Sequence, residues 1–123
     1  RGLGDVYKRQ PLTPQTKEKF NAAAFKKMRN DAIFINIGRG ATVVEEDLIQ
    51  ALEDGEIGGA GLDVFRDEPI SADHPLLKFK NVIALPHIGS ATVVTRDRMI
   101  QLSINNVKSV LQGQPAITPV TDK

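Results

Sequence analysis

The sequence contains no cysteine, and this absence excludes disulfide scaffolds, zinc sites with thiolate ligands and thiol nucleophiles. Aromatic residues make up only 5% of the chain, and 16 lysines and arginines are balanced by 15 aspartates and glutamates. Without a basic stripe, a nucleic-acid partner is disfavoured. No apolar run approaches the roughly 18 residues that cross a membrane, and no signal peptide is visible. We therefore expect no membrane partner and a cytoplasmic protein.

The sequence also lacks the strand–GxGxxG–helix unit that binds the pyrophosphate of a dinucleotide. The nearest candidate, GLGDVY in residues 2–7, carries Tyr7 where the third glycine should stand. The first ten residues, RGLGDVYKRQ, have neither helical nor strand periodicity and do not match the rest of the chain. We therefore expect residues 1–10 to be a non-native or unstructured leader.

Three apolar runs are present, and an ionisable side chain follows or lies within each of them. The runs occupy residues 32–37, 58–65 and 82–85. The first does not alternate with polar residues, which predicts a strand buried on both faces, and the third predicts a shorter buried strand. The small residues of the second predict a strand with close backbone packing. Arg39 follows the first run, Asp63 lies within the second, and His87 follows the third.

Helices are expected between and after these strands. The expected helices cover residues 22–28, 45–54 and 91–113. Asn21 can cap the first, while Gly55 and Gly113 can end the second and third. Buried strands joined by helices predict a parallel α/β sheet.

The carboxyl ends of parallel strands lie at one edge of a sheet, where α/β proteins bind ligands. Arg39, Asp63 and His87 are evenly spaced along the chain, as successive strand–connection–strand units would place them. We therefore expect the three side chains to face one crevice.

The residues near these strand ends could perform acid–base chemistry on a carboxylate ligand. The planar guanidinium of Arg39 can bind a carboxylate through two hydrogen bonds, and its flanking glycines allow close approach. His87 can act as a general acid, particularly if a carboxylate such as Glu68 stabilises its charged form. Each residue also has a non-functional interpretation. Arg39 can be a surface arginine in a turn, His87 a structural histidine and Glu68 a solvated loop residue.

Asp63 and His74 are open to structural interpretations. A carboxylate in an apolar strand costs free energy unless it is satisfied, so Asp63 should either cap a neighbouring helix or accept from a cofactor amide. His74 stands in a proline-bounded loop, and we interpret it as structural. Asp63, His74 and His87 have no HxxxH or HxH pairing, so no metal site is expected. The absence of GxSxG disfavours a serine hydrolase.

Four motifs, in order along the chain, resemble those of the D-isomer-specific 2-hydroxyacid dehydrogenases: PLTPQT, INIGRGATV, GLDVFRDEP and PHIGSAT. Within the family, NIGRG, DHPLL and LPHIGSATVVTRDRM look most like glyoxylate/hydroxypyruvate reductases. The resemblance implies a fragment of an oxidoreductase that uses NAD or NADP. Such an enzyme reduces small 2-oxo acids, such as glyoxylate or hydroxypyruvate, to D-2-hydroxy acids by hydride transfer.

The resemblance also implies roles for individual positions. Arg39 matches the residue that holds the carboxylate of the 2-oxo acid, His87 the proton donor and Glu68 its carboxylate partner. The substrate is expected to contact Arg39, His87 and Ser90. Asp63 matches the residue that meets the nicotinamide end of the cofactor. The residues implied at the cofactor site are Pro11, Ile37, Gly38, Arg39, Asp63, His87 and Gly89.

The fold implied by the resemblance is the C-terminal half of a Rossmann-like doubly wound parallel sheet, followed by a long helix. Residues 11–90 would form a partial dinucleotide-binding domain. Residues 91–113 would form a helix that crosses toward a missing substrate domain, and 114–123 a tail. Without a phosphate-binding unit, we expect the chain alone neither to bind NAD(P)H tightly nor to reduce glyoxylate. A homodimer is the family expectation for the full-length protein.

Two other functions stay open at this point. A 3-phosphoglycerate dehydrogenase-like enzyme would share these motifs, because the pocket that separates the two activities lies mostly in the missing lobe. A non-catalytic module that senses dinucleotide, as in related corepressors, can retain Arg39, Glu68 and His87. The choice between NAD and NADP depends on a residue after a strand that this chain lacks.

Overall fold

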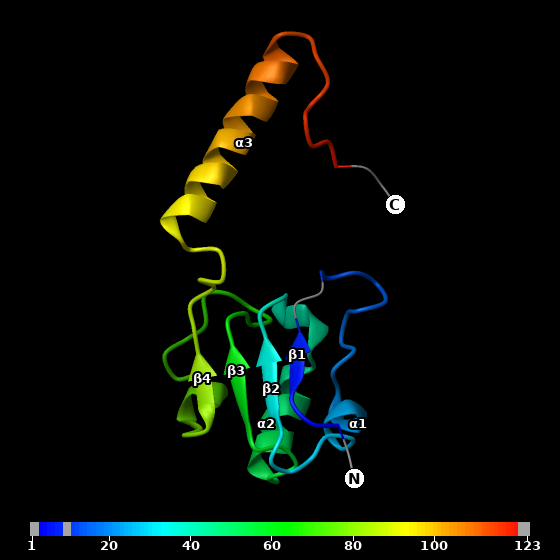
Figure 1. Ribbon diagram of the computed structural model, residues 1–123. Coiled ribbons are helices and arrows are strands. Elements are labelled where there is room, and N and C mark those ends of the chain that lie inside the picture. The colour runs from blue at the N-terminus through cyan, green and yellow to red at the C-terminus, as the bar shows by residue number, and fades with distance from the viewer. Residues whose placement is uncertain (1–2, 9–10, 121–123) are drawn as a thin grey trace. The chain divides into compact units, whose positions relative to one another are not determined.

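The structure is a computed structural model that describes residues 3–8 and 11–120. The chain divides into two compact units, Arg1–Gly89 and Ser90–Lys123. The first unit is built on a parallel sheet of order β1-β2-β3-β4 (Figure 1). Its strands are β1 (Val6–Lys8), β2 (Ile33–Asn36), β3 (Gly59–Leu62) and β4 (Val82–Ala84). The predicted parallel α/β sheet is therefore confirmed.

The strand β1 lies within the first ten residues, where a non-native or unstructured leader was expected, so Val6–Lys8 are not unstructured. Val6 pairs with Phe34 in parallel register. Asp5 Oδ1 accepts a hydrogen bond from the amide of Ile33 at 2.8 Å. Three residues are too few to show strand periodicity, although valine and tyrosine favour strands. Residues 1, 2, 9 and 10 of the expected leader lie outside the described residues.

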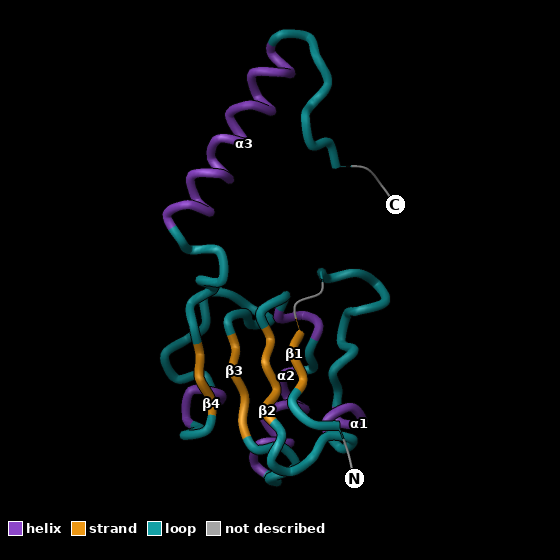
Figure 2. The backbone as a smooth tube through the Cα atoms, viewed as in Figure 1, coloured by secondary structure: helices purple, strands orange, loops and turns teal. Residues whose placement is uncertain are grey.

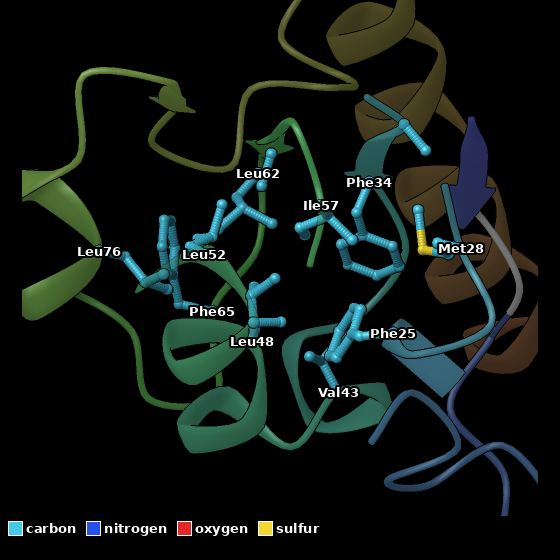
Figure 3. Packing of buried hydrophobic residues seen from close by; sticks show 13 residues of the cluster. Phe25, Met28, Phe34, Val43, Leu48, Leu52, Ile57, Leu62, Phe65 and Leu76 are labelled. Atoms are coloured by element: carbon cyan, nitrogen blue, oxygen red, sulfur yellow. The ribbon is translucent and has the colours of Figure 1, made fainter. Parts of the chain in front are cut away.

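The hydrophobic core lies between the sheet and two helices, α1 (Ala22–Phe25) and α2 (Glu45–Glu53). Figure 2 shows α2 behind the strands. The rings of Phe25 and Phe34 meet edge to face with centroids 5.3 Å apart, and Leu48 of α2 is buried beside them (Figure 3). Burial of these apolar side chains fixes α2 against the sheet and thereby sets the position of the strand ends.

The helix boundaries follow local capping and tertiary pairing. Asn21 caps α1 as predicted, because its Oδ1 accepts from the amide of Ala24 at 3.2 Å. The helix ends before the predicted residue 28, since the backbone beyond it bonds to Leu3 instead: Arg29 donates its amide to the carbonyl of Leu3 at 2.8 Å. Gly55 follows α2 with φ +64°, the left-handed conformation expected of a residue that ends a helix.

The sheet is buried on one face only, so the prediction of two-faced burial is wrong. Phe34 is fully buried, whereas its neighbour Ile33 is 36% exposed and Ile37 is 52% exposed. In β4, which the sequence predicted to be buried, Ile83 is 67% exposed. The apolar runs are continuous, but α1 and α2 pack only against the face that carries Phe34. The opposite face therefore presents isoleucines to solvent.

The second unit contains the predicted long helix, α3 (Val93–Leu111). Thr92 caps its start, with Oγ1 accepting from the amide of Thr95 at 3.2 Å, and Gly113 follows its end with φ +72°. Asn106 bonds to Thr118, which attaches the segment after the helix to the helix itself. None of the helices in the described residues combines the length and apolar character needed to cross a lipid bilayer.

Candidate active site

The carboxyl ends of β2, β3 and β4 supply the polar residues predicted from the sequence. Asp63, just after β3, bonds to the backbone beside His87, which follows β4. Glu68 lies in the loop after β3 and bonds to the His87 ring. The positive charge of Arg39, which follows β2, helps to lower the pKa of Glu68. The parallel register therefore gathers these groups at one edge of the sheet.

Glu68 and His87 form a hydrogen-bonded pair at this edge. The Nδ1 atom of His87 lies 2.7 Å from Glu68 Oε2, and Glu68 Oε1 accepts from the amide of Phe65 at 2.8 Å. Partial burial pushes the pKa of Glu68 upward. The hydrogen bonds from Phe65 and His87 outweigh that effect, and with the charge of Arg39 they hold the pKa of the carboxyl below its usual range. Glu68 is therefore an anion at neutral pH.

The charge of Glu68 determines where the proton lies on the His87 ring. A carboxylate can only accept, so Nδ1 of His87 must be the donor. The Nε2 atom has no hydrogen-bond partner among the described residues, and the side chain of His87 is 46% exposed. The ring is thus held at one nitrogen and open at the other. This is the arrangement required of a group that transfers a proton.

Asp63 holds the backbone that carries His87. Its two carboxylate oxygens accept from the amides of Ile88 at 2.8 Å and Gly89 at 2.7 Å, which satisfies a side chain that is only 4% exposed. His87 has φ +54°, a left-handed conformation that costs a non-glycine residue about 1–2 kcal/mol. A Cβ atom at Gly89 would lie 3.0 Å from Asp63 Oδ2, so a glycine suits this close approach.

The loop around Arg39 is stabilised from inside the protein. Arg39 Nη1 donates to the carbonyl of Gly38 at 2.8 Å. The carbonyl of Arg39 accepts from Thr42 Oγ1 at 2.7 Å and from Asn36 Nδ2 at 3.2 Å. Sequence reasoning missed Asn36 and Thr42, because their partners are backbone atoms. The available signal was two polar residues next to the glycine-flanked arginine.

Gly40 has a steric reason to be glycine. A Cβ atom at this position would lie 1.9 Å from the carbonyl carbon of Phe65. No side chain fits there without moving the backbone, so the second glycine of GRG lets the β2 loop pack against the end of β3. The glycines flanking Arg39 therefore serve the packing of the loop as well as leaving room for a ligand.

His74 belongs to a second Glu–His pair and is structural, as expected. Its Nε2 lies 3.0 Å from Glu45 Oε1, and its Nδ1 accepts from the amide of Leu76 at 3.3 Å. It thereby caps the short 3₁₀ helix η2 (Pro75–Lys78). Glu45 Oε2 accepts from the amide of Arg66 at 2.9 Å. Both ring nitrogens of His74 are thus occupied.

A cavity of about 480 Å³ lies beside the Glu68–His87 pair. Its lining residues are Phe65, Glu68, Pro69, Ile70, Leu77, Ala84, Leu85, Pro86 and His87. Arg39 and Asp63 do not line it, so the structure does not bring all the predicted residues into one cavity. Glu68 and His87 are the ionisable residues of an otherwise apolar wall.

The remaining predicted residues are Pro11, Ile37 and Ser90. Ile37 is exposed directly after β2, and the carbonyl of Pro11 accepts from Thr16 Oγ1 at 2.8 Å. Ser90 is the first residue of the second unit. Their roles toward cofactor and substrate stay predictions. Within residues 3–8 and 11–120, no three His, Asp or Glu side chains are grouped as metal ligands.

Comparison with known sequences identifies the family that the chain matches. Residues 6–89 match the family described as D-isomer specific 2-hydroxyacid dehydrogenase, NAD binding domain. The match begins at Val6 and so includes β1. The chain is 53% identical over 104 residues to glyoxylate/hydroxypyruvate reductase B of Salmonella newport, covering 85% of this chain and 32% of the relative. The chain thus spans about a third of the length of the curated relatives it matches.

Solved structures give the same result. The NADPH-dependent glyoxylate/hydroxypyruvate reductase of Sinorhizobium meliloti, in complex with NADP and malonate, is 43% identical with a TM-score of 0.86; the match covers 92% of this chain and 35% of that one. A D-lactate dehydrogenase with NAD⁺ from Lactobacillus jensenii is 33% identical with a TM-score of 0.79, covering 93% of this chain and 38% of that one.

Proposed function

We propose a reaction from one premise: the chain belongs to the family of D-isomer-specific 2-hydroxyacid dehydrogenases, whose NAD-binding domain it matches over residues 6–89. The proposed reaction is the NAD(P)H-dependent reduction of a 2-oxo acid, such as glyoxylate or hydroxypyruvate, to the D-2-hydroxy acid. The observation that supports it best is the Glu68–His87 pair, in which Nδ1 is held at 2.7 Å and Nε2 is open.

The residues present fit the nicotinamide end of a dinucleotide. Ile37 offers an exposed apolar surface at the end of β2, and the backbone of Gly89 is exposed at the end of the β4 loop. Together with Pro11 and Gly38 they would hold that end of the cofactor, and Asp63 would act there by holding the backbone of Ile88 and Gly89. When bound, the reduced cofactor supplies the hydride. The strand–GxGxxG–helix unit for the pyrophosphate does not occur in this sequence.

In the proposed mechanism, Arg39 binds the carboxylate of the 2-oxo acid through its guanidinium and so fixes the keto group. Negative charge grows on the keto oxygen during reduction, and His87 delivers a proton to it from Nε2. Glu68 accepts from Nδ1 throughout and stabilises the charged ring before transfer. Ser90, which follows the His87 loop, is proposed to contact the substrate. General acid catalysis of this kind contributes about 10² to 10⁴ in rate.

The proposal is tested in a full-length enzyme that carries this chain in place of the matched segment of the Salmonella reductase. Turnover by this enzyme, and its loss in His87→Gln, would assign the general acid to His87 of this chain. Initial rates are measured with glyoxylate, hydroxypyruvate and 3-phosphohydroxypyruvate, each with NADH and NADPH. We expect turnover of the two smaller acids. A preference for the phosphorylated acid would indicate a 3-phosphoglycerate dehydrogenase, and cofactor binding without turnover a non-catalytic module.

A second test concerns the chain by itself. Because the sequence lacks the phosphate-binding unit, we expect no tight binding of NADH to the isolated chain. Titration of NADH fluorescence measures this, and micromolar affinity would contradict it. The homodimer is proposed only for the full-length protein, and sedimentation of the full-length enzyme tests it.

A further inference from the structure

Two buried polar side chains, Asn36 and Thr42, meet at the carbonyl of Arg39. Asn36 is 1% exposed and Thr42 is fully buried. A buried amide or hydroxyl costs free energy unless it is hydrogen-bonded, and both are satisfied here by this loop. The carbonyl of Arg39 receives three donors: the side chains of Asn36 and Thr42 and the amide of Thr42 at 3.2 Å. The peptide that follows Arg39 is therefore fixed in orientation.

Asn36 also fixes the backbone before Arg39. Its Oδ1 accepts from the amide of Gly38 at 3.1 Å, while its Nδ2 donates to the carbonyl of Arg39 at 3.2 Å. One side chain thus spans the arginine and holds the chain on both sides of it. The carbonyl of Gly38 in turn accepts from Arg39 Nη1 at 2.8 Å. Asn36 is therefore connected to the guanidinium through a single residue, Gly38.

These contacts matter because, among the described residues, the guanidinium of Arg39 is hydrogen-bonded only to its own loop, at the carbonyl of Gly38. The φ of −142° and ψ of 139° of Arg39 lie in the broad extended region, where many orientations of the side chain are accessible. No ion pair holds its guanidinium among the described residues. Gly40 packs closely against the backbone of Phe65, since a Cβ atom there would collide with it. The backbone that carries the guanidinium is thus held by the hydrogen bonds of Asn36 and Thr42.

We propose that Asn36 and Thr42 are positioning residues that direct the guanidinium of Arg39 toward the carboxylate of the substrate. The inference rests on the proposed function, because it takes the ligand of Arg39 to be a 2-oxo acid. A carboxylate bound in two hydrogen bonds requires the planar guanidinium to be well oriented, so loosening the Arg39 backbone weakens substrate binding. The effect should fall on the 2-oxo acid and not on the cofactor.

The first experiment compares Thr42→Val with Thr42→Ser in the full-length enzyme. Valine keeps the shape and removes the hydroxyl donor, whereas serine keeps the donor. Loss of one hydrogen bond to the Arg39 carbonyl should raise KM for glyoxylate about fivefold to tenfold. KM for NADPH and kcat should stay close to wild type, because the interaction lost is made equally in the ground state and the transition state. Thr42→Ser should restore the wild-type KM.

A second variant, Asn36→Asp, keeps the Oδ1 acceptor for Gly38 and removes the Nδ2 donor. We expect KM for glyoxylate to rise at least as far as in Thr42→Val. If both variants lower the melting temperature but leave KM for glyoxylate unchanged, Asn36 and Thr42 only stabilise the loop and the positioning role is wrong. Equal increases in KM for glyoxylate and NADPH would also overturn it.

A third measurement does not need turnover, so it separates this inference from the proposed function. The Nε–Hε signal of Arg39 is recorded by ¹⁵N NMR in the isolated chain, with Thr42→Val and Thr42→Ser beside the wild type. We expect a shift or broadening in Thr42→Val and a wild-type signal in Thr42→Ser. An unchanged signal in Thr42→Val overturns the positioning role even if the enzyme reduces glyoxylate. A shifted signal supports it even if the enzyme does not.

Discussion

The sheet-containing unit holds two Glu–His pairs, and they differ in what surrounds the imidazole. In the Glu45–His74 pair, the side chains are 11% and 18% exposed, and both ring nitrogens are hydrogen-bonded. In the Glu68–His87 pair, the side chains are 34% and 46% exposed, and only Nδ1 is bonded among the described residues. The same two residue types therefore form a structural link in one place and a candidate acid in the other.

The hydrogen-bond pattern explains this division. Leu76 donates its amide to Nδ1 of His74, so the proton of a neutral ring lies on Nε2 and points to Glu45. That ring cannot take up or release a proton without losing a bond. The ring of His87 is oriented from the opposite nitrogen, so Nε2 can change its protonation while Nδ1 stays bound to Glu68. A histidine becomes available for catalysis when one nitrogen is left without a protein partner.

The largest expected effect comes from changing the two histidines in turn in the full-length enzyme. We predict that His87→Gln lowers kcat by about a hundredfold or more, because the proton donor is lost. The matched variant His74→Gln should keep kcat near wild type and lower the melting temperature, because it disturbs the cap of η2. Steady-state kinetics and thermal unfolding measure both. Near-normal kcat in His87→Gln, or a greater loss in His74→Gln, would reverse the assignment.

Asp63→Asn tests what keeps the Glu68–His87 pair in place at the carboxyl edge of the sheet. An asparagine can accept from only one of the amides of Ile88 and Gly89, and its NH₂ group would face the other. The loop that carries His87 should shift, and a misplacement of this kind lowers kcat by roughly tenfold to a hundredfold. Asp67→Asn is the control, since its side chain is 95% exposed. A change confined to KM for the cofactor would instead assign Asp63 to the nicotinamide alone.

Glu45→Ala tests the structural pair through stability. The change removes the acceptors of the His74 ring and of the Arg66 amide, and leaving these partly buried donors unsatisfied should cost about 2 kcal/mol of unfolding free energy. Glu46→Ala is the matched control, because its side chain is 62% exposed and its ion pair with Arg66 should contribute less than about 1 kcal/mol. Urea denaturation measures both. Equal losses of unfolding free energy in Glu45→Ala and Glu46→Ala would mean that the hydrogen bonds of Glu45 stabilise the protein no more than a surface ion pair does.

The residues at the carboxyl edge of the sheet could be predicted from the sequence, because apolar runs that form strands and glycines that end helices are local signals. Arg39, Asp63 and His87 do follow or end parallel strands. Other features depend on contacts that no local pattern carries. Glu45 was interpreted only as an acidic residue at a helix start, yet it binds His74, which lies far along the chain. Asn36 and its backbone partners leave no periodic signature.

The burial of the strands was predicted less well than their positions along the chain, for a related reason. A continuous apolar run such as residues 32–37 indicates that both faces of a strand can be covered, but not which elements cover them. In this chain α1 and α2 cover one face, and Ile37 stays 52% exposed on the other. The three residues of β1 were missed because so short a strand has no measurable alternation.

The smallest expected effect is the pH dependence of stability that Glu68 contributes. Because the pKa of Glu68 is lowered in the folded protein, its contribution is fully present above the pKa of an unfolded glutamate, about 4.3, and is lost as the pH falls through the lower folded value. The unfolding free energies of wild type and Glu68→Gln, measured in urea, should therefore differ at about pH 6. That difference should shrink as the pH falls below about 4.3.

The magnitude should be less than about 1 kcal/mol, because the Glu68–His87 pair is partly exposed and water screens it. An unchanged denaturant slope in both proteins is the control that the same transition is being measured. A difference that grew as the pH fell would mean that the carboxyl of Glu68 is protonated more easily in the folded protein. The ring of His87 would then lack the anion that orients it, and the distinction between the two Glu–His pairs would no longer follow from their hydrogen bonds.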